Sequence, residues 1–230
     1  MLPVAILAGG LATRLRPVTE SIPKALIDLN GEPFLGHQLR LLRENGVERV
    51  VLCLGYLGGQ IEQYAGDGSR FGLHVEYSHD GEQLLGTAGA VRRALPLLGE
   101  AFFVLYGDSY LLCNFKIVEE AFLRSGKAGL MTVFRNDGRW DRSNVEFSDG
   151  RIRAYDKVNR TPQMRHIDYG LGILQSAVFD AIPKGRPHDL ALLYQDLLRR
   201  GELAAQEVSE RFFEVGSIEG VQELREHLSK

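Results

Sequence analysis

The chain has 230 residues, of which 44% are hydrophobic and 25% are charged, and its formal net charge is −3. A chain of this length and composition can bury a sizeable core, and its charge gives no reason to expect nucleic acid or an anionic membrane as a partner. The apolar run at the N-terminus is too short to span a membrane and lacks the charged segment of a secretion signal. We therefore expect a cytoplasmic protein. The sequence leaves its oligomeric state open, a homo-oligomer included.

The first half of the chain alternates short apolar runs with helical patterns. This alternation predicts an α/β fold with a doubly wound, mostly parallel sheet. Strands are expected at residues 4–7, 47–54, 73–77, 101–106 and 129–134. Helices are expected at residues 34–45, 58–65, 87–98 and 115–124.

The pattern changes after Asn136. Two expected strands at 144–147 and 151–155 flank Ser148-Asp149-Gly150, which is typical of a hairpin turn. We expect further strands at 167–174, 204–208 and 212–215, and helices around 176–182, 189–199 and 218–228. This part is predicted to be a small antiparallel elaboration that folds over the first. Since no linker separates the two, we expect one domain over residues 1–230, with parts at about 1–135 and 136–230.

The two cysteines, Cys53 and Cys113, both lie in apolar surroundings. Two cysteines form neither a disulfide framework nor a zinc site. We therefore expect both to be buried small hydrophobic side chains in a reducing compartment.

A glycine turn follows the first expected strand and precedes two cations. Gly9 and Gly10 allow the backbone to approach a phosphate closely, and Arg14 can pair with phosphoryl oxygens through two hydrogen bonds. Lys24 follows Pro23, which restrains the backbone that carries it. The simpler interpretation is a tight turn with solvated cations. The buried strand before the turn and the two cations after it favour a polyphosphate site, but the loop lacks the Gly-Lys-Ser/Thr of a P-loop and a full G-x-G-x-x-G.

Asp108 follows the expected buried strand at 101–106. The carboxyl ends of parallel strands share one edge of a sheet, so Asp108 is expected beside the first loop. A carboxylate near phosphates is a suitable ligand for Mg²⁺, although an aspartate here can also cap a turn.

The chain contains three motifs: AGG-x-x-TRL-x-P…PK, GTAGA at 86–90 and YGDS at 106–109. They resemble those of the sugar-1-phosphate nucleotidyltransferases, also called nucleoside-diphosphate-sugar pyrophosphorylases. The resemblance extends to VGS-x-EG at 215–220, and it is strongest to D-glycero-α-D-manno-heptose 1-phosphate guanylyltransferases and N-acetylmuramate-1-phosphate uridylyltransferases. It implies a Rossmann-like nucleotide-diphospho-sugar transferase fold and a role in sugar nucleotide biosynthesis, for capsule or lipopolysaccharide. The implied substrates are an NTP and a sugar 1-phosphate, and the implied cofactor is Mg²⁺.

The resemblance also implies roles for single residues. Arg14, Lys24 and Asp108 would be catalytic: Arg14 would grip the departing pyrophosphate, Lys24 would orient the α-phosphate and Asp108 would bind Mg²⁺ together with Glu214. The nucleoside would be held by Leu7, Ala8, Gly9, Gly10, Gly86, Thr87, Ala88 and Gly89. The sugar phosphate would be bound by Asn144, Lys157, Asp168, Tyr169 and Gly170.

Two positions depart from the pattern of the family. Ala12 stands where many members have glycine, and Glu214 stands where most have aspartate as the second metal ligand. Three of the sugar-binding assignments have structural alternatives. Lys157 can be a solvated lysine at a strand end, Asn144 can begin a strand and Asp168 can be a cap.

The expected reaction uses GTP with D-glycero-α-D-manno-heptose 1-phosphate or mannose 1-phosphate. The alternatives are UTP or CTP with N-acetylmuramate or glucose 1-phosphate, and a non-catalytic nucleotide-sugar sensor on the same fold. A choline-phosphate type of cytidylyltransferase shares the first loop and is a third option.

Overall fold

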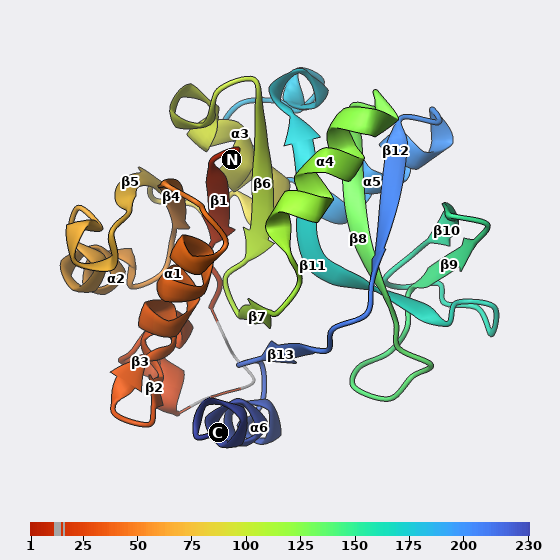
Figure 1. Cartoon of the computed structure of the whole chain (residues 1–230). Helices are drawn as coiled ribbons and strands as arrows, with labels where there is room; N and C mark the ends of the chain where they lie inside the picture. Colours follow the sequence, from red (N-terminus) through yellow and green to blue (C-terminus); the bar gives the residue numbers. More distant parts are fainter. Residues whose placement is uncertain (12–14, 16) are drawn as a thin grey trace.

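The structure is a computed structural model that describes residues 1–11, 15 and 17–230. Its centre, within these residues, is a nine-stranded sheet with helices on both faces (Figure 1). Parallel strands form one half of this sheet, in the order β6-β1-β4-β5. Their bounds are Val4–Leu7 for β1, Arg49–Leu54 for β4, His74–His79 for β5 and Ala101–Tyr106 for β6.

The other half of the sheet is built mainly of antiparallel pairs. Strand β11 (His166–Gln175) is hydrogen-bonded directly to β6 and also pairs with β8 (Gly129–Arg135) and β9 (Val145–Ser148). Strand β9 continues into β10 (Arg151–Tyr155), and β12 (Leu203–Val208) pairs in parallel with β8. This half therefore extends the sheet at its edge and does not fold over the parallel half in the way that the sequence had suggested. Strand β8 belongs to the first part of the chain but pairs with strands that follow residue 136. The predicted α/β fold with its mostly parallel sheet and antiparallel elaboration is confirmed.

Alternating apolar residues along the parallel strands divide the core into two layers. Val4 and Ile6 of β1 face the layer that α1 (Phe34–Glu44), α2 (Gly58–Ala65) and α4 (Phe115–Ser125) cover. Ala5 faces the opposite layer, covered by α3 (Gly86–Leu98) and α5 (Leu190–Arg199). Figure 1 shows α1 and α4 in front of the sheet and α3 and α5 behind it. This two-sided cover explains why the strands read as continuous apolar runs.

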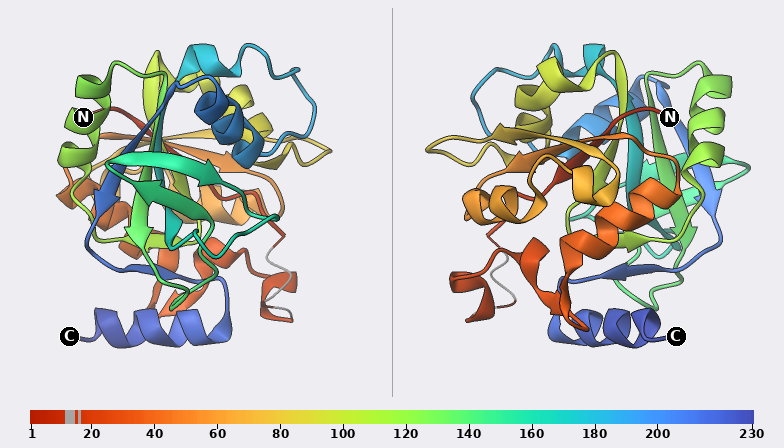
Figure 2. Two further views of the ribbon diagram at one scale, coloured as in Figure 1. Left: turned by 90° about the vertical axis from the view of Figure 1, so that its right-hand side faces the viewer. Right: turned by 60° about the vertical axis from the view of Figure 1, so that its left-hand side comes forward.

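A third and smaller core lies at one end of the molecule. It joins α6 (Ile218–Leu228) to the short strand β13 (Phe212–Glu214) through buried side chains that include Phe213, Val215 and Leu224. Both views of Figure 2 show α6 across this end, away from the sheet. Strand β13 pairs antiparallel with β7 (Ser109–Leu111), so the C-terminal segment returns to the residues that follow β6.

Most expected elements are present, with shifts at their ends. The predicted hairpin is confirmed, and Asp149 and Gly150 both have positive φ, at 52° and 71°, as a tight hairpin turn requires. The helix expected around 176–182 is wrong, because only a single 3-10 turn forms at Ser176–Phe179. Short elements that were not predicted are β7, β2 (Asp28–Leu29), β3 (Glu32–Pro33) and the 3-10 turns Val18–Glu20, Lys24–Leu26 and Ser69–Phe71.

Both cysteines are buried and unpaired, as expected. Burial raises the pKa of each thiol to about 12, so both stay protonated at neutral pH and are poor nucleophiles. Within the described part of the chain, no helix is long and apolar enough to cross a membrane.

The carboxyl ends of β1 and β6 approach each other too closely for a side chain at Gly107. The Gly107 N–H donates to the Leu7 carbonyl at 3.1 Å. A Cβ at Gly107 would lie 2.9 Å from the Leu7 carbonyl carbon and 3.0 Å from the Ala8 Cα. Since both neighbours are backbone, they cannot turn away as a side chain would.

We therefore expect Gly107→Ala to lower the free energy of unfolding by about 1–3 kcal/mol, because the added methyl overpacks this junction. Gly59→Ala is the matched control, since nothing lies within 4 Å of its Cβ position in α2, and it should be neutral or stabilising by up to about 1 kcal/mol. Urea denaturation measures both. A Gly107→Ala protein as stable as wild type would contradict the close approach of the two strand ends.

Candidate active site

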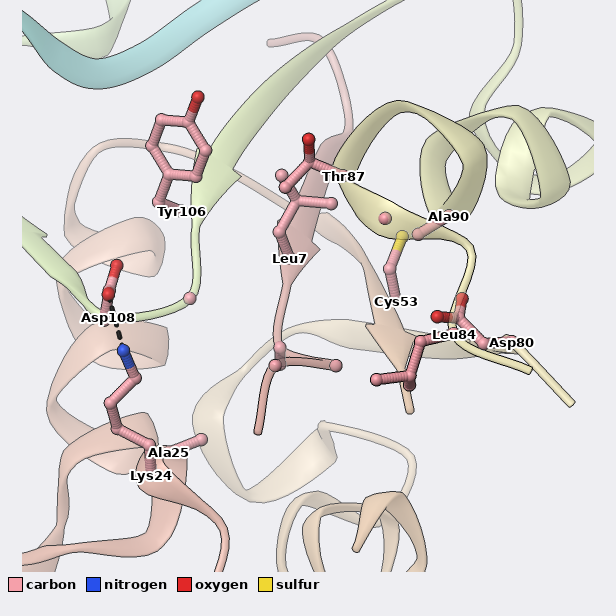
Figure 3. A pocket seen from close by; sticks show the side chains of 15 residues that line it. Leu7, Lys24, Ala25, Cys53, Asp80, Leu84, Thr87, Ala90, Tyr106 and Asp108 are labelled. Atoms are coloured by element: carbon pink, nitrogen blue, oxygen red, sulfur yellow. Dashed lines mark hydrogen bonds and ion pairs between the residues drawn. The ribbon is translucent and has the colours of Figure 1, made fainter. Parts of the chain in front are cut away.

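A cavity of about 260 Å³ opens at the carboxyl ends of β1, β4 and β6 (Figure 3). Its walls include most of the predicted nucleotide-binding and catalytic residues, namely Leu7, Ala8, Gly9, Gly10, Lys24, Gly86, Thr87 and Asp108. They also include side chains that were not predicted to bind substrate: Ala25, Cys53, Asp80, Leu84, Ala90 and Tyr106. Arg14 and Ala12, which were singled out from the sequence, lie outside the described residues.

The predicted cation and the predicted metal ligand are in direct contact at one end of the cavity. The Lys24 Nζ lies 2.6 Å from Asp108 Oδ2, and the two side chains are 21% and 26% exposed. Lys24 begins a 3-10 turn behind Pro23, whose φ is −63°, so the backbone below the amine is restrained. Because the pair is partly open to solvent, its two charges remain accessible to a ligand with phosphate groups.

The backbone of Glu214 is brought next to the residues that follow β6 by the pairing of two short strands. It stands opposite Ser109 in the β13–β7 ladder, and the Val215 N–H donates to the Asp108 carbonyl at 2.9 Å. Among the described residues, Glu214 lines a separate hollow with Trp140 and Arg211 and is not part of the cavity wall that contains Asp108. The described residues contain no group of three or more His, Cys, Asp or Glu side chains arranged to hold a metal. A cation here would therefore take further oxygen ligands from water or from a bound phosphate.

The other end of the cavity is largely apolar but contains a buried carboxylate. Asp80 follows β5 and is only 7% exposed, and it lies beside Cys53, Leu84 and Ala90 (Figure 3). Its Oδ2 accepts the Leu85 N–H at 3.0 Å. Burial raises the pKa of the Asp80 carboxyl above its ordinary value, although that hydrogen bond and the nearby Arg93 charge offset part of the rise.

The GTAG segment is clamped to the residues that precede α5. Gly86 has a φ of +67°, and a Cβ there would lie 2.8 Å from the His188 carbonyl oxygen. The same oxygen accepts the Ala88 N–H at 2.9 Å. The Thr87 hydroxyl accepts the Leu190 N–H at 2.7 Å. Gly86 and Thr87 line the cavity, whereas Ala88 and Gly89 are absent from its described walls and pack toward the 186–188 segment.

Predicted sugar-phosphate residues gather around Asp168, whose side chain is 5% exposed. Its Oδ2 accepts the Tyr155 hydroxyl at 3.1 Å and the Tyr106 hydroxyl at 3.5 Å. The Lys157 Nζ lies 3.9 Å from the same carboxylate and 3.1 Å from the Tyr106 oxygen. Burial, reinforced by the charge of Asp168, raises the pKa of both tyrosines above the ordinary value, so both are neutral hydroxyls. Because Tyr106 also lines the cavity, it connects this cluster to the nucleotide-binding loop.

The remaining predicted sugar residues differ in orientation. Asn144 accepts the Asp168 N–H at 2.9 Å and so supports the cluster. The ring of Tyr169 is buried against Phe134 and Phe212, away from the cavity. Gly170 has a φ of +95° and donates its N–H to Asp168 at 3.1 Å. Lys157 is not simply a solvated lysine, since its amine also lies 4.8 Å over the Tyr106 ring.

Comparison with known proteins shows the family. The nucleotidyl transferase family model matches residues 4–146. The chain is 30% identical over 219 residues to the N-acetylmuramate alpha-1-phosphate uridylyltransferase of Neisseria meningitidis, covering 93% of this chain and 92% of that one. It is 32% identical over 220 residues to the mannose-1-phosphate guanylyltransferase catalytic subunit beta of Xenopus tropicalis, covering 92% of this chain but only 60% of that protein.

A solved structure agrees with this relationship. The crystal structure of HddC from Yersinia pseudotuberculosis complexed with GMP-PN matches with a TM-score of 0.83 and 25% identity, over 99% of this chain and 100% of that one. The chain therefore belongs to the nucleotidyl transferase family, and within it to the sugar-1-phosphate nucleotidyltransferases.

Proposed function

We propose that this protein transfers the nucleotidyl group of GTP to D-glycero-α-D-manno-heptose 1-phosphate or mannose 1-phosphate. The observation that carries the proposal is one cavity in which Tyr106 joins the Lys24–Asp108 pair to the Lys157–Asp168 cluster. A phosphate oxygen of the sugar 1-phosphate attacks the α-phosphorus of the NTP, and the bond to the bridging oxygen breaks to release pyrophosphate. The nucleophile is already an anion, so the reaction needs no general base.

Catalysis then consists of positioning the phosphates and neutralising their charge. Lys24 would hold the α-phosphate, and Arg14 would hold the β- and γ-phosphates. Mg²⁺ is the proposed cofactor, held by Asp108 and Glu214, and when bound it would neutralise charge on the phosphates. The carboxylate of Asp108 now faces the Lys24 amine at 2.6 Å. Binding of the nucleotide would therefore separate these two groups, since each would gain a partner of opposite charge.

The sugar phosphate would bind beside Tyr106, where the Lys157 side chain is 37% exposed. Asp168 and the Tyr106 oxygen fix this amine from two sides, so Lys157 is a positioned cation rather than a freely moving one. The amine can contact the phosphate of the acceptor, while the buried Asp168 acts through Lys157 and Tyr155.

The choice of nucleotide is supported by the names of relatives. Those relatives are a uridylyltransferase and guanylyltransferases, and the similar solved structure is a complex with GMP-PN. We propose GTP, with UTP or CTP and N-acetylmuramate or glucose 1-phosphate as the alternative. A non-catalytic sensor is less favoured, because it has no need for Lys24 and Asp108 in the same cavity.

This function is tested by measuring pyrophosphate release with four NTPs and with the 1-phosphates of heptose, mannose, glucose and N-acetylmuramate.

Asp108→Asn and Lys24→Met should each lower kcat by roughly 10²- to 10³-fold, because each removes a group that stabilises charge on the transferring phosphate. Asp149→Asn and Lys116→Met make the same chemical changes at exposed positions and should keep wild-type rates. Full turnover by Asp108→Asn would contradict its role, and nucleotide binding without pyrophosphate release would favour the sensor.

Lys157→Met tests the acceptor side of the site. We expect the KM for the sugar 1-phosphate to rise roughly 10- to 100-fold, because a charge-assisted hydrogen bond is lost, while the KM for the NTP changes little. Steady-state kinetics with each substrate varied in turn measure both constants, and Lys116→Met is the control. An equal rise in both KM values would show that Lys157 does not act on the acceptor alone.

A further inference from the structure

The Tyr106 hydroxyl lies between the Lys157 amine and the Asp168 carboxylate. Its oxygen is 3.1 Å from the Lys157 Nζ and 3.5 Å from Asp168 Oδ2. The amine and the carboxylate themselves are 3.9 Å apart, which is about 1 Å longer than a direct charge-assisted hydrogen bond. The two opposite charges are therefore joined through a neutral hydroxyl and not by direct contact.

The chemistry of the three groups fixes the direction of these hydrogen bonds. A lysine amine only donates and an ionised carboxylate only accepts, whereas a phenol hydroxyl has one proton and can do both. The Tyr106 oxygen therefore accepts from Lys157, and its own proton points to Asp168. Burial, reinforced by the charge of Asp168, raises the pKa of the Tyr106 hydroxyl above its ordinary value, so the proton stays on the oxygen at neutral pH.

Asp168 is satisfied without a hydrogen bond from Lys157. Its Oδ2 accepts the Tyr155 hydroxyl at 3.1 Å as well as that of Tyr106, and its Oδ1 accepts the Gly170 N–H at 3.1 Å. The Asp168 side chain is 5% exposed, whereas that of Lys157 is 37% exposed. The amine therefore keeps N–H donors that are open to a ligand.

Coulomb attraction acts to close the gap between the amine and the carboxylate, and it is stronger where water is scarce, as it is around the buried Asp168. An amine in direct contact with that carboxylate would have its charge neutralised and its donors turned inward. The Tyr106 hydroxyl opposes this contact in two ways. It offers the amine another partner, and it engages Oδ2, the carboxylate oxygen that the amine faces.

We propose that Tyr106 is a positioning residue whose hydroxyl keeps the Lys157 amine out of a direct ion pair with Asp168 and so directs it to the phosphate of the sugar 1-phosphate, an inference that rests on the proposed function. Figure 3 shows the hydroxyl on the side of the Tyr106 ring that points away from Lys24 and Asp108. Its removal should therefore leave the contacts proposed for the nucleotide phosphates in place.

A purely structural role for the Tyr106 hydroxyl makes a different prediction. If the hydroxyl only completes the hydrogen bonds of a buried cluster, its loss disturbs the junction of β6 with β11 and impairs the binding of both substrates. That effect would be the same whether or not residue 157 is a lysine. Tyr106→Phe isolates the hydroxyl, because phenylalanine keeps the ring that lies 4.8 Å below the amine.

The first experiment is a double-mutant cycle of Tyr106→Phe with Lys157→Met, measured by steady-state kinetics with GTP and mannose 1-phosphate or with the fastest pair of the panel above. Tyr106→Phe alone should lower kcat/KM for the sugar 1-phosphate roughly 10-fold, in the range for loss of a hydrogen bond to a charged group. The KM for the NTP should change little. In the Lys157→Met background, Tyr106→Phe should have no further effect beyond about twofold, the usual limit of additivity.

Tyr64→Phe is the matched control for this cycle. It removes a hydroxyl that lies 3.4 Å from the Glu32 carboxylate, and Tyr64 is in α2 and outside the walls of the cavity. Both kinetic constants should stay at their wild-type values. Wild-type kinetics in Tyr106→Phe, or an equal loss with and without Lys157, would overturn the proposal.

Asp168→Asn tests the ion pair itself. It removes the charge that attracts the amine and keeps the size of the side chain, with one oxygen for the tyrosine hydroxyls. Tyr106→Phe should therefore cost less in the Asp168→Asn background than in the wild type, and an equal cost in the two backgrounds would overturn the proposal. If Asp168→Asn fails to fold, by circular dichroism, the cycle with Lys157 decides.

The same measurements separate this inference from the proposed function. If no pair of the panel yields pyrophosphate, both are overturned. If pyrophosphate is released and the loss in Tyr106→Phe does not depend on Lys157, the proposed reaction stands and the role of Tyr106 is overturned.

Discussion

The parallel pairing of β1 with β4 on one side and β6 on the other determines where the candidate active site lies. The register aligns Leu7 with Cys53 and with Tyr106, so residues at the carboxyl ends of the three strands form one row. The ladder continues one step past the strands, because the Ala8 N–H bonds to the Cys53 carbonyl and the Gly107 N–H to that of Leu7. All of these residues line the cavity. Beyond this row the backbone loops diverge, which is where ligands bind in open α/β sheets.

The antiparallel half of the sheet carries the proposed sugar-phosphate site next to this row. Strand β11 pairs with β6 and carries Asp168 and Gly170 to the neighbourhood of Tyr106. A separate domain would reach the same place only through an interface that can open. Here the connection is the hydrogen-bond ladder itself, so the distance between the two proposed substrates is set by strand spacing. A transfer between two bound phosphates depends on such fixed geometry.

Local patterns in the sequence predicted the elements well, because they depend on residues close in the chain. The apolar run at 4–7, the GTAGA segment and the Asp149-Gly150 turn each have a signal of a few residues. The segment at 176–182 does not form the expected helix, and it forms one 3-10 turn instead. Pro183 is a local signal against a helix here, because it disfavours helical backbone at Ile182.

The long-range features of the site could not be predicted in this way. Lys24 and Asp108 were both identified, but their contact joins residues 84 positions apart and depends on the packing of the turn that begins at Lys24. Asp80 stands in His79-Asp80-Gly81, which in sequence resembles an ordinary turn. Only the fold shows that it is buried at the end of β5, where its side chain lines the cavity.

Two carboxylates of low exposure, Asp168 and Asp80, differ in the number of hydrogen-bond donors that the chain supplies to them. Asp168 accepts hydrogen bonds from the Gly170 N–H and from two tyrosine hydroxyls, and a lysine amine lies 3.9 Å away. A carboxylate satisfied in this way gains little from a ligand and serves to hold its neighbours. Asp80 receives one side-chain hydrogen bond from the described part of the chain, although its exposure of 7% is as low as that of the Asp168 side chain. The cost of burying it is therefore only partly offset by the described part of the chain.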